Sequence, residues 1–402
     1  MISEEMQEKM VEQLIDRIED LNREILTEIG KQIKYIGTLT PTQAHKLTQM
    51  LMYGENMQKI ARTLAKITNM SVNDINNILK QTAIENQEFA RQFYKAKSVK
   101  FVPYSENKAL QEQVKAISKI TAKRFRNIIN STGYVLNNRF IPIQKVYTEV
   151  LDNAILNIMQ GKTTYQEEMR RAMKELTEKG VRVRLDKNGN PTGTKVIDFR
   201  SGYTRRADSQ IRMNILDSIK QMSNELQEQF GKEFGADGVE ISVHEHPAPD
   251  HAPIQGHQYS KEAFEKLDKE LQRPIGTLNC YHYTFSIVLG ISEPEYTQEQ
   301  LDKINADNEK GFTWNGKHYT LYEGTQLQRR LETNIRQLKD RQIVARAMED
   351  METVDMCQRK ITILNFKYKK LCNISNLKPD KKRLTVSGYR RVKVGWYENS
   401  RK

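Results

Sequence analysis

The chain has 402 residues, of which 38 % are hydrophobic and 29 % charged, and its formal net charge at pH 7 is +13. It has no run of about 18 apolar residues that could cross a membrane, and its acidic, amphipathic start lacks the features of a signal peptide. We therefore expect a soluble protein without an export signal, long enough for two or three domains. Three widely spaced cysteines argue against disulfides and favour a reducing compartment.

Helical periodicity dominates the first 180 residues. Apolar residues recur at intervals of three and four from Val11 to Ile36, which predicts one long amphipathic helix with a narrow apolar seam. Such a seam can pack against a helix of the same chain or of a partner chain, and both alternatives stay open. Capping signals and periodicity predict further helices from Thr40 to about Tyr53, from Ser71 to about Lys97, after Ser105, and across residues 141–160 and 164–178.

Short strands enter the pattern after residue 180. Residues 181–199 predict a β-hairpin, and a long helix follows from near Thr204 to Phe234, with Gly235 as its C-cap. The strand GVEISV then leads into a cluster of histidines, and FTWNGKHYTLYE predicts a second hairpin around Asn315-Gly316.

The C-terminal part is strongly basic. From about residue 324 a long, highly charged helical region is predicted, followed by an end that we expect to be extended or ordered only on binding. The residues from Arg359 to Lys402 hold fourteen Lys or Arg against two acids, a net charge of +12. This surplus indicates either a solvated tail or contact with a polyanion, of which nucleic acid is the first candidate. The candidate nucleic-acid-binding residues are Lys367, Lys369, Lys370, Lys381, Lys382, Arg383, Arg390, Arg391 and Lys393.

Together these patterns predict an α+β fold that is predominantly α-helical. We expect a helical domain over residues 1–180 and a smaller mixed α/β domain with short strands and hairpins over residues 181–325. Residues 326–402 are predicted to form the long charged helix and the basic tail.

Five of the seven histidines gather with Cys280 in the two pieces ISVHEHPAPDHAPIQGHQYS and LNCYHYTF. His244 with His251 forms one candidate pair of metal ligands, and Cys280 with His282 forms another, since residues i and i+2 of a strand share a face. Three interpretations stay open: a structural zinc on these four residues, a hydrogen-bonded network that includes Asp250, or a catalytic centre. The sequence has no helical His-Glu-x-x-His motif, thiol-protease signature or glycine-rich phosphate loop.

Seven short motifs follow one another in the C-terminal half. They are GADGVEISVH at 235–244, QGHQYS at 255–260, NCYH at 279–282, GISEP at 290–294, GKHYT at 316–320, YEGTQLQRRLE at 322–332 and RLTVSGY at 383–389. In order and spacing they resemble the phage minor capsid protein 2 family, a relative of the Mu F-like head morphogenesis proteins. The first 180 residues are covered only loosely.

The resemblance also bears on the histidine cluster. His244, His251, Cys280 and His282 coincide with family positions, whereas His246 and His257 do not, which favours the first four as the functional or structural set. The chain departs from the family pattern in having Tyr281 where Arg is common, and His246 and Ala248 where Gly and Arg are usual.

The resemblance implies a minor structural protein of a tailed-phage head, made in the bacterial cytoplasm and present in several copies in the virion at the portal or inside the capsid. It would assist head assembly, DNA packaging or DNA delivery, with no membrane partner. The expected partners are the portal protein or the major capsid protein, through the helical N-terminal half, and packaged double-stranded DNA, through the basic C-terminus. The alternative is a metal- or thiol-dependent, hydrolase-like enzyme or effector packaged in the head and centred on His251 and Cys280. No cofactor follows with certainty, and a structural zinc is the one that the residues allow.

Overall fold

The computed structural model describes residues 4–36, 55–96, 101–136, 139–146, 149–150, 165–185, 191, 204–277 and 280–393. These residues form long α-helices and small antiparallel sheets, which confirms the predicted, predominantly helical α+β class. None of the described helices is long and apolar enough to span a membrane.

The chain groups into two compact units, each assembled from three separate segments. Unit 1 combines Met1–Ile15, Thr68–Arg126 and Ser209–Glu323, and unit 2 combines Asp16–Ile67, Asn127–Asp208 and Gly324–Lys402. The division of the sequence at residues 180 and 325 stays a prediction.

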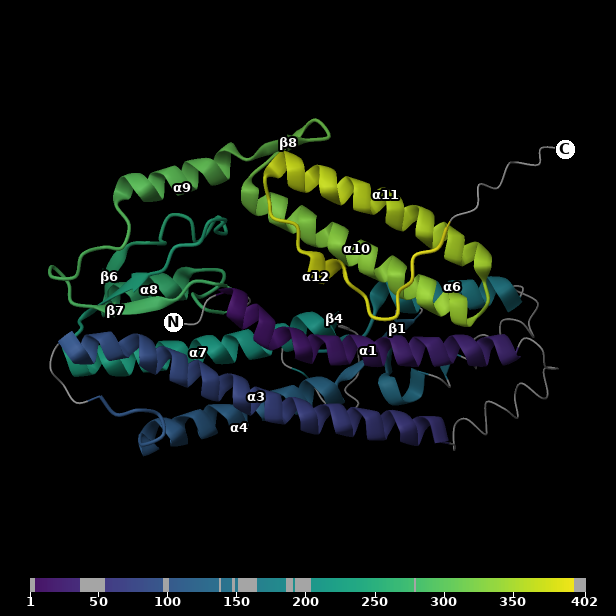
Figure 1. The fold of residues 1–402 in the computed structure, drawn as a ribbon, viewed down its shortest axis with the longest axis horizontal. Coiled ribbons are helices and arrows are strands. Elements are labelled where there is room, and N and C mark those ends of the chain that lie inside the picture. Colours follow the sequence, from purple (N-terminus) through teal and green to yellow (C-terminus); the bar gives the residue numbers. More distant parts are fainter. Residues whose placement is uncertain are drawn as a thin grey trace. The chain divides into compact units, whose positions relative to one another are not determined.

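Unit 1 contains parts of three helices that lie side by side in Figure 1. They are α3 (Glu55–Ala96), α4 (Lys108–Asn130) and α7 (Ala207–Phe234). Buried Asn86 of α3 donates a hydrogen bond to Ser223 Oγ of α7 over 3.0 Å, which ties these two helices together. α7 ends as predicted at Gly235, whose φ is +75°, a conformation that glycine adopts without steric cost.

A three-stranded antiparallel sheet in unit 1 carries the histidine cluster. Its strands are β5 (Gly238–Ile241) in the centre, flanked by β6 (Gln258–Ser260) and β7 (Thr284–Ile287). The helix α8 (Lys261–Glu270) follows β6 directly, with the Ser260 side chain as its N-cap. Ile241 at the end of β5 pairs with Thr284 at the start of β7. The loop that leaves β5 therefore meets the residues that enter β7.

Unit 1 also contains the predicted Asn-Gly hairpin. The helix α9 (Gln298–Lys310) begins with a capping box formed by Thr297 and Gln300. The strands β8 (Phe312–Trp314) and β9 (Lys317–Tyr319) then pair around Asn315 and Gly316, which both have positive φ. Two consecutive residues with positive φ are typical of the type I′ turn that Asn-Gly favours, so this prediction is confirmed.

Unit 2 contains a four-stranded antiparallel sheet in the order β2-β1-β3-β4. Its strands are β1 (Thr132–Leu136), β2 (Arg139–Pro142), β3 (Arg182–Arg184) and β4 (Thr204–Arg206), and η1 (Ile143–Lys145) and α6 (Tyr165–Lys179) lie between β2 and β3 in the sequence.

Three sequence predictions concern residues in this sheet or next to it in the sequence. The helix predicted from residue 164 is confirmed as α6. The helix predicted from residue 141 is wrong at its start, where β2 pairs with β1, and residues 151–160 lie outside the described residues. Of the hairpin predicted over residues 181–199, β3 and a bridge from Leu185 to Pro191 are described.

The first helix, α1 (Glu4–Ile36), carries the predicted seam. Its seam residues from Val11 to Ile29 are at most 4 % exposed. Within unit 2, Arg23 of α1 forms an ion pair of 3.3 Å with Asp340. From Val11 to Ile29 the seam is therefore covered by this chain rather than left for a partner chain, and the side chains of Ile33 and Ile36 lie outside the described residues.

The charged region predicted as one helix is two helices, α10 (Leu321–Ala347) and α11 (Met351–Ser375), which lie side by side in Figure 1. The chain reverses at Glu349, whose φ is +57°, and Asp350 then caps α11 by accepting a hydrogen bond from Thr353 N over 3.1 Å. Gln342 and Gln358 are hydrogen-bonded across the pair at 3.2 Å. Although the region is highly charged, the pair has its own buried residues, among them Ile335, Val354 and Tyr368.

The start of α3 differs from the sequence prediction, whereas α4 is confirmed with a different capping residue. α3 begins at Glu55, and Ser71 is fully buried within it, so the predicted start at Ser71 is wrong. α4 is capped by Asn107, which accepts from Leu110 N over 3.0 Å, rather than opened by Ser105. The helix predicted between residues 40 and 53 lies outside the described residues.

Candidate functional site

Three of the four predicted metal ligands converge in unit 1. One ligand atom from each of His251, Cys280 and His282 lies within 4.8 Å of the other two. Cys280 Sγ is 3.6 Å from His251 Nδ1 and 3.3 Å from His282 Nδ1. The three residues are 2 %, 5 % and 3 % exposed, so the cluster is closed to solvent.

The sheet explains why these residues meet. His251 belongs to the loop that leaves β5, and Cys280 and His282 directly precede β7, whose start pairs with the end of β5. Below them, Ile241, Ile254 and Ile275 form an apolar cluster that includes the Cys280 side chain. The site thus lies at one end of the sheet, on an apolar base.

Outer hydrogen bonds orient both imidazoles. His251 Nε2 lies 2.8 Å from the Arg273 carbonyl, which can only accept, so this nitrogen carries a proton. His282 Nε2 lies 3.1 Å from Gln255 Oε1, and the same oxygen accepts from the His244 backbone N–H over 2.9 Å. Each imidazole therefore presents Nδ1, not Nε2, to the sulfur of Cys280.

The electrostatics of the cluster favour a thiolate. Burial opposes ionisation of Cys280, but its hydrogen bonds with His251 and His282 and the positive charges of His282 and Lys220 outweigh it and lower the pKa of Cys280 to about 5. Burial likewise opposes protonation of His251, but its contacts with Cys280 and the Arg273 carbonyl raise the pKa of His251. A thiolate between imidazoles is suited to binding a soft or borderline cation.

The same groups also resemble a thiol nucleophile with its base, but two observations weigh against catalysis. Cys280 is only 5 % exposed, which leaves a substrate no open approach to the sulfur. Asp250 Oδ2 is 3.8 Å from His251 Nε2, too far for a hydrogen bond, and Asp250 Oδ1 instead accepts from Arg273 over 3.1 Å. The arrangement is better suited to holding a loop than to attacking a substrate.

The other three histidines of the two sequence pieces lie outside this group of three. His244 stands beside it, with its ring centroid 5.9 Å from that of His282, and its Nδ1 accepts from the His246 backbone N–H over 3.3 Å. His257 packs its ring against Tyr259, with the centroids 6.5 Å apart.

Sequence reasoning missed two residues that support the cluster. Gln255 orients His282, and Lys220 of α7, which is only 1 % exposed, places its ammonium 5.0 Å from the Tyr281 ring centroid. Gln255 belongs to the QGHQYS motif and could have been noticed there. Lys220 has no local signal, because its role depends on contacts across more than sixty residues of sequence.

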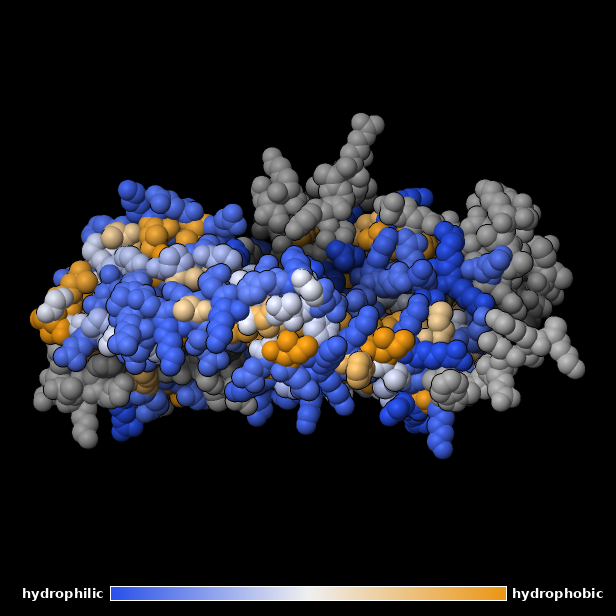
Figure 2. Space-filling view, turned by 90° about the horizontal axis from the view of Figure 1, so that it is seen from above, coloured by the Kyte–Doolittle hydropathy of each residue, from blue (hydrophilic) through white to orange (hydrophobic). Residues whose placement is uncertain are grey.

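The predicted nucleic-acid-binding residues lie on α11 and the segment after it, in unit 2. All of them are exposed except Arg383, which is half-buried and paired with Asp380 at 3.1 Å. Figure 2 shows a mostly hydrophilic face on which hydrophobic residues are scattered in separate patches. Such a face favours polar or charged partners over one large apolar contact.

The sequence predicted that the segment after α11 is extended or ordered only on binding. As far as residue 393 the segment is instead folded. A short helix, α12 (Lys381–Leu384), follows, and Asp380 N donates to Tyr368 Oη over 2.9 Å. Further on, the Tyr389 hydroxyl and the Val392 N–H both bond Gln358 Oε1, at 3.0 and 3.1 Å. The segment therefore folds back along α11 and holds its basic residues in place.

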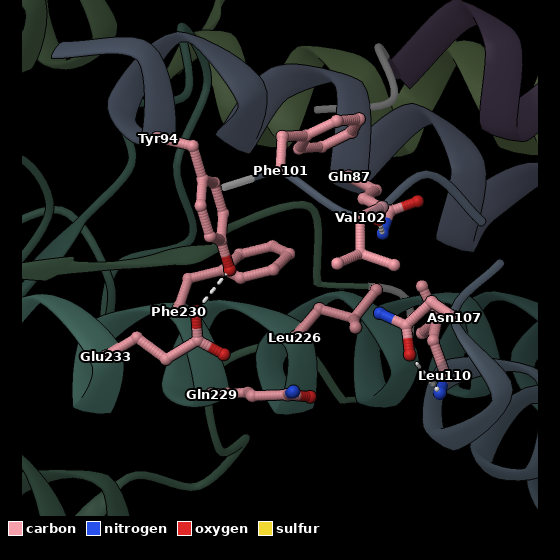
Figure 3. Close-up of a pocket in the computed structure, with 10 residues that line it drawn as sticks. All are labelled: Gln87, Tyr94, Phe101, Val102, Asn107, Leu110, Leu226, Gln229, Phe230 and Glu233. Carbon is pink, nitrogen blue, oxygen red and sulfur yellow. Dashed lines mark hydrogen bonds between the residues drawn. The ribbon is translucent and has the colours of Figure 1, made fainter. Parts of the chain in front are cut away.

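Unit 1 also has a pocket between α3 and α7 (Figure 3). Tyr94 and Glu233 are hydrogen-bonded to each other across it, and Gln87 Nε2 donates to the Val102 carbonyl over 2.6 Å. These lining groups already satisfy one another, so the pocket has few polar groups left to orient a ligand.

Comparison with known protein families shows to which family the chain belongs. Residues 2–373 match the family model described as phage minor capsid protein 2. The chain belongs to the phage minor capsid protein 2 family. The match includes the helical N-terminal part that the sequence motifs covered only loosely. No curated protein and no solved structure gave a match.

As a phage minor capsid protein, the chain has a structural role in the phage head and is a component of the virion, associated with the capsid. The resemblance to this family is thus confirmed, and six of the seven motifs lie within the matched residues, whereas RLTVSGY at 383–389 lies beyond them.

Proposed function

We propose that this minor capsid protein has a non-catalytic role at the portal or on the inner capsid wall, where its basic C-terminal region contacts packaged DNA. The observation that carries the DNA part is the basic surface of unit 2. We define this surface by the nine predicted residues Lys367, Lys369, Lys370, Lys381, Lys382, Arg383, Arg390, Arg391 and Lys393.

Two physical features support DNA as the partner. The exposed cations lie on two adjacent supports, α11 and the segment folded back along it, so they face solvent from a fixed scaffold. Contacts of Lys and Arg with phosphates release counterions, and this term dominates binding that is independent of base sequence. Packaged DNA has no fixed base sequence at a given capsid position, so such binding suits a head protein.

For contact with the portal or capsid protein we favour surfaces other than the α1 seam, which this chain covers itself from Val11 to Ile29. The helical N-terminal half offers exposed apolar residues on α3 and α4, among them Met70 and Ile120, at 43 % and 48 % exposure. These outward faces are the proposed contact region.

Neutralising part of the basic surface is expected to weaken DNA binding. In the variant Lys381→Gln, Lys382→Gln, Arg390→Gln, Arg391→Gln, the backbone contacts that dock the segment remain. The affinity for a random-sequence duplex should fall about tenfold or more near 100 mM salt, and the slope of log K against log salt should become shallower by roughly 3 to 4, close to 0.9 per lost phosphate contact. Fluorescence anisotropy over a salt series measures both quantities.

The matched control removes four exposed lysines from unit 1, on α8 and α9, and so changes the net charge by the same amount. These lysines are Lys266, Lys269, Lys303 and Lys310. The control should bind DNA nearly as the wild type does. Equal losses in both variants would mean that net charge, rather than this surface, governs binding, and the proposal would fail.

A further inference from the structure

The group His251, Cys280 and His282 has the spacing of ligands around a tetrahedral ion. With Zn–S near 2.3 Å and Zn–N near 2.0–2.1 Å, the sulfur and nitrogen ligands of a tetrahedral zinc lie about 3.6 Å apart. Cys280 Sγ lies 3.6 Å and 3.3 Å from the two Nδ1 atoms. The sulfur therefore lies at about the required distance from both nitrogens, and the three residues each place a ligand atom within 4.8 Å of the other two.

Hydrogen bonds alone cannot satisfy the Cys280 sulfur and both Nδ1 atoms when all three groups are neutral. Both Nε2 atoms carry protons that are donated outward, to the Arg273 carbonyl and to Gln255 Oε1. Both neutral Nδ1 atoms then point a lone pair at the same sulfur, and the single S–H of Cys280 can donate to only one of them. Without an ion, pairing the second lone pair needs an additional buried proton, which leaves the group with a net positive charge.

A bound cation resolves this conflict, because it accepts electron pairs from the thiolate and both imidazoles at once. The outward Nε2–H bonds are the outer hydrogen bonds that metal-bound histidines commonly make to carbonyl and carboxylate oxygens, and they fix the ring orientation. Sulfur and imidazole ligands together favour zinc among the common cellular cations.

We propose that His251 Nδ1, Cys280 Sγ and His282 Nδ1 bind one zinc ion, which has a structural role. The ion would fasten the loop between β5 and β6 to the start of β7. The near-complete burial of all three ligands favours a structural site over an open catalytic one. The fourth ligand comes from outside the three, and His244 stands beside them.

The proposal is tested by metal content and by cobalt spectroscopy on the full chain, expressed without a histidine tag and purified without chelators. Mass spectrometry for metals should find about one zinc per chain. After replacement of zinc by Co²⁺, the protein should show the near-ultraviolet absorption of a cobalt–thiolate bond. This second measurement needs no variant and so does not depend on whether a variant folds.

Variants of the three proposed ligands test whether these residues bind the ion. Cys280→Ser should lose the cobalt–thiolate band and at least nine-tenths of the bound zinc, and His251→Ala and His282→Ala should lose zinc to a similar extent. The matched controls His257→Ala and Cys357→Ser change a histidine and a buried free cysteine outside the group, and should keep both.

Three results would overturn the proposal. The first is a wild-type chain that takes up no zinc when the ion is supplied at equal concentration. The second is a cobalt-loaded wild type without a thiolate band. The third is a Cys280→Ser variant that keeps its zinc.

Discussion

Removal of zinc with a chelator is expected to unfold the β5–β6–β7 region of unit 1, the largest single effect that we predict. Structural zinc contributes on the order of 10 kcal/mol to small domains that depend on it. Here the ion would hold the loop after β5, which has little regular structure of its own between Ile241 and Gln258. Without the ion, only hydrogen bonds, such as those of His251 and Gln255, would join the loop to the residues before β7.

Hydrogen exchange read by mass spectrometry locates this effect. Peptides covering β5, the following loop and β7 should exchange at least a hundredfold faster after chelation, and they should recover when zinc is returned. Peptides from α10 and α11 serve as the internal control and should not change. Unchanged exchange around β5 in verified zinc-free protein would show that hydrogen bonds suffice to hold the loop.

Truncation of Tyr368 is expected to cost unit 2 about 3–5 kcal/mol of unfolding free energy, as for other large buried aromatic residues. Tyr368 is 1 % exposed and packs with Ile335 and Cys372 between α10 and α11. Its hydroxyl donates to Glu332 over 2.8 Å and accepts from Asp380 N over 2.9 Å. Tyr368→Ala therefore removes both the core of the helix pair and the anchor of the basic segment.

The matched variant Tyr368→Phe separates these two contributions. It keeps the ring and loses only the hydroxyl, so it should cost about 1–3 kcal/mol, the penalty for buried groups left without a partner. Denaturant unfolding followed by circular dichroism measures both variants. A cost below 1 kcal/mol for Tyr368→Ala would contradict the assignment of this residue to the core. A binding assay should also show weaker DNA binding for Tyr368→Ala, because the basic segment loses its anchor.

Elements with a strong local signal could be predicted from the sequence. The seam of α1 follows from apolar residues at helical spacing, and the β8–β9 hairpin follows from Asn315-Gly316, which is suited to positive φ. Local signals failed where the surrounding structure decided. Ser71 looks like a cap but lies inside α3, and the reversal at Glu349 has neither Gly nor Pro to mark it.

The candidate site was predicted in its residue types but not in its contacts. Cys280 and His282 were expected to lie together because of their spacing, and they do. The approach of His251 depends on the pairing of β5 with β7, and the roles of Gln255 and Lys220 depend on contacts that no local pattern encodes. Likewise, the charge of the C-terminal segment was visible in the sequence, but its docking onto Gln358 was not.

The most direct test of the proposed role is protein–DNA crosslinking in purified, DNA-filled heads of the phage that encodes this chain, followed by mass spectrometry. We expect DNA crosslinks on peptides from residues 359–393, and their loss in heads that carry the four-residue neutralised variant. Filled heads in which the chain is present but its DNA crosslinks lie only outside these residues would contradict the proposal.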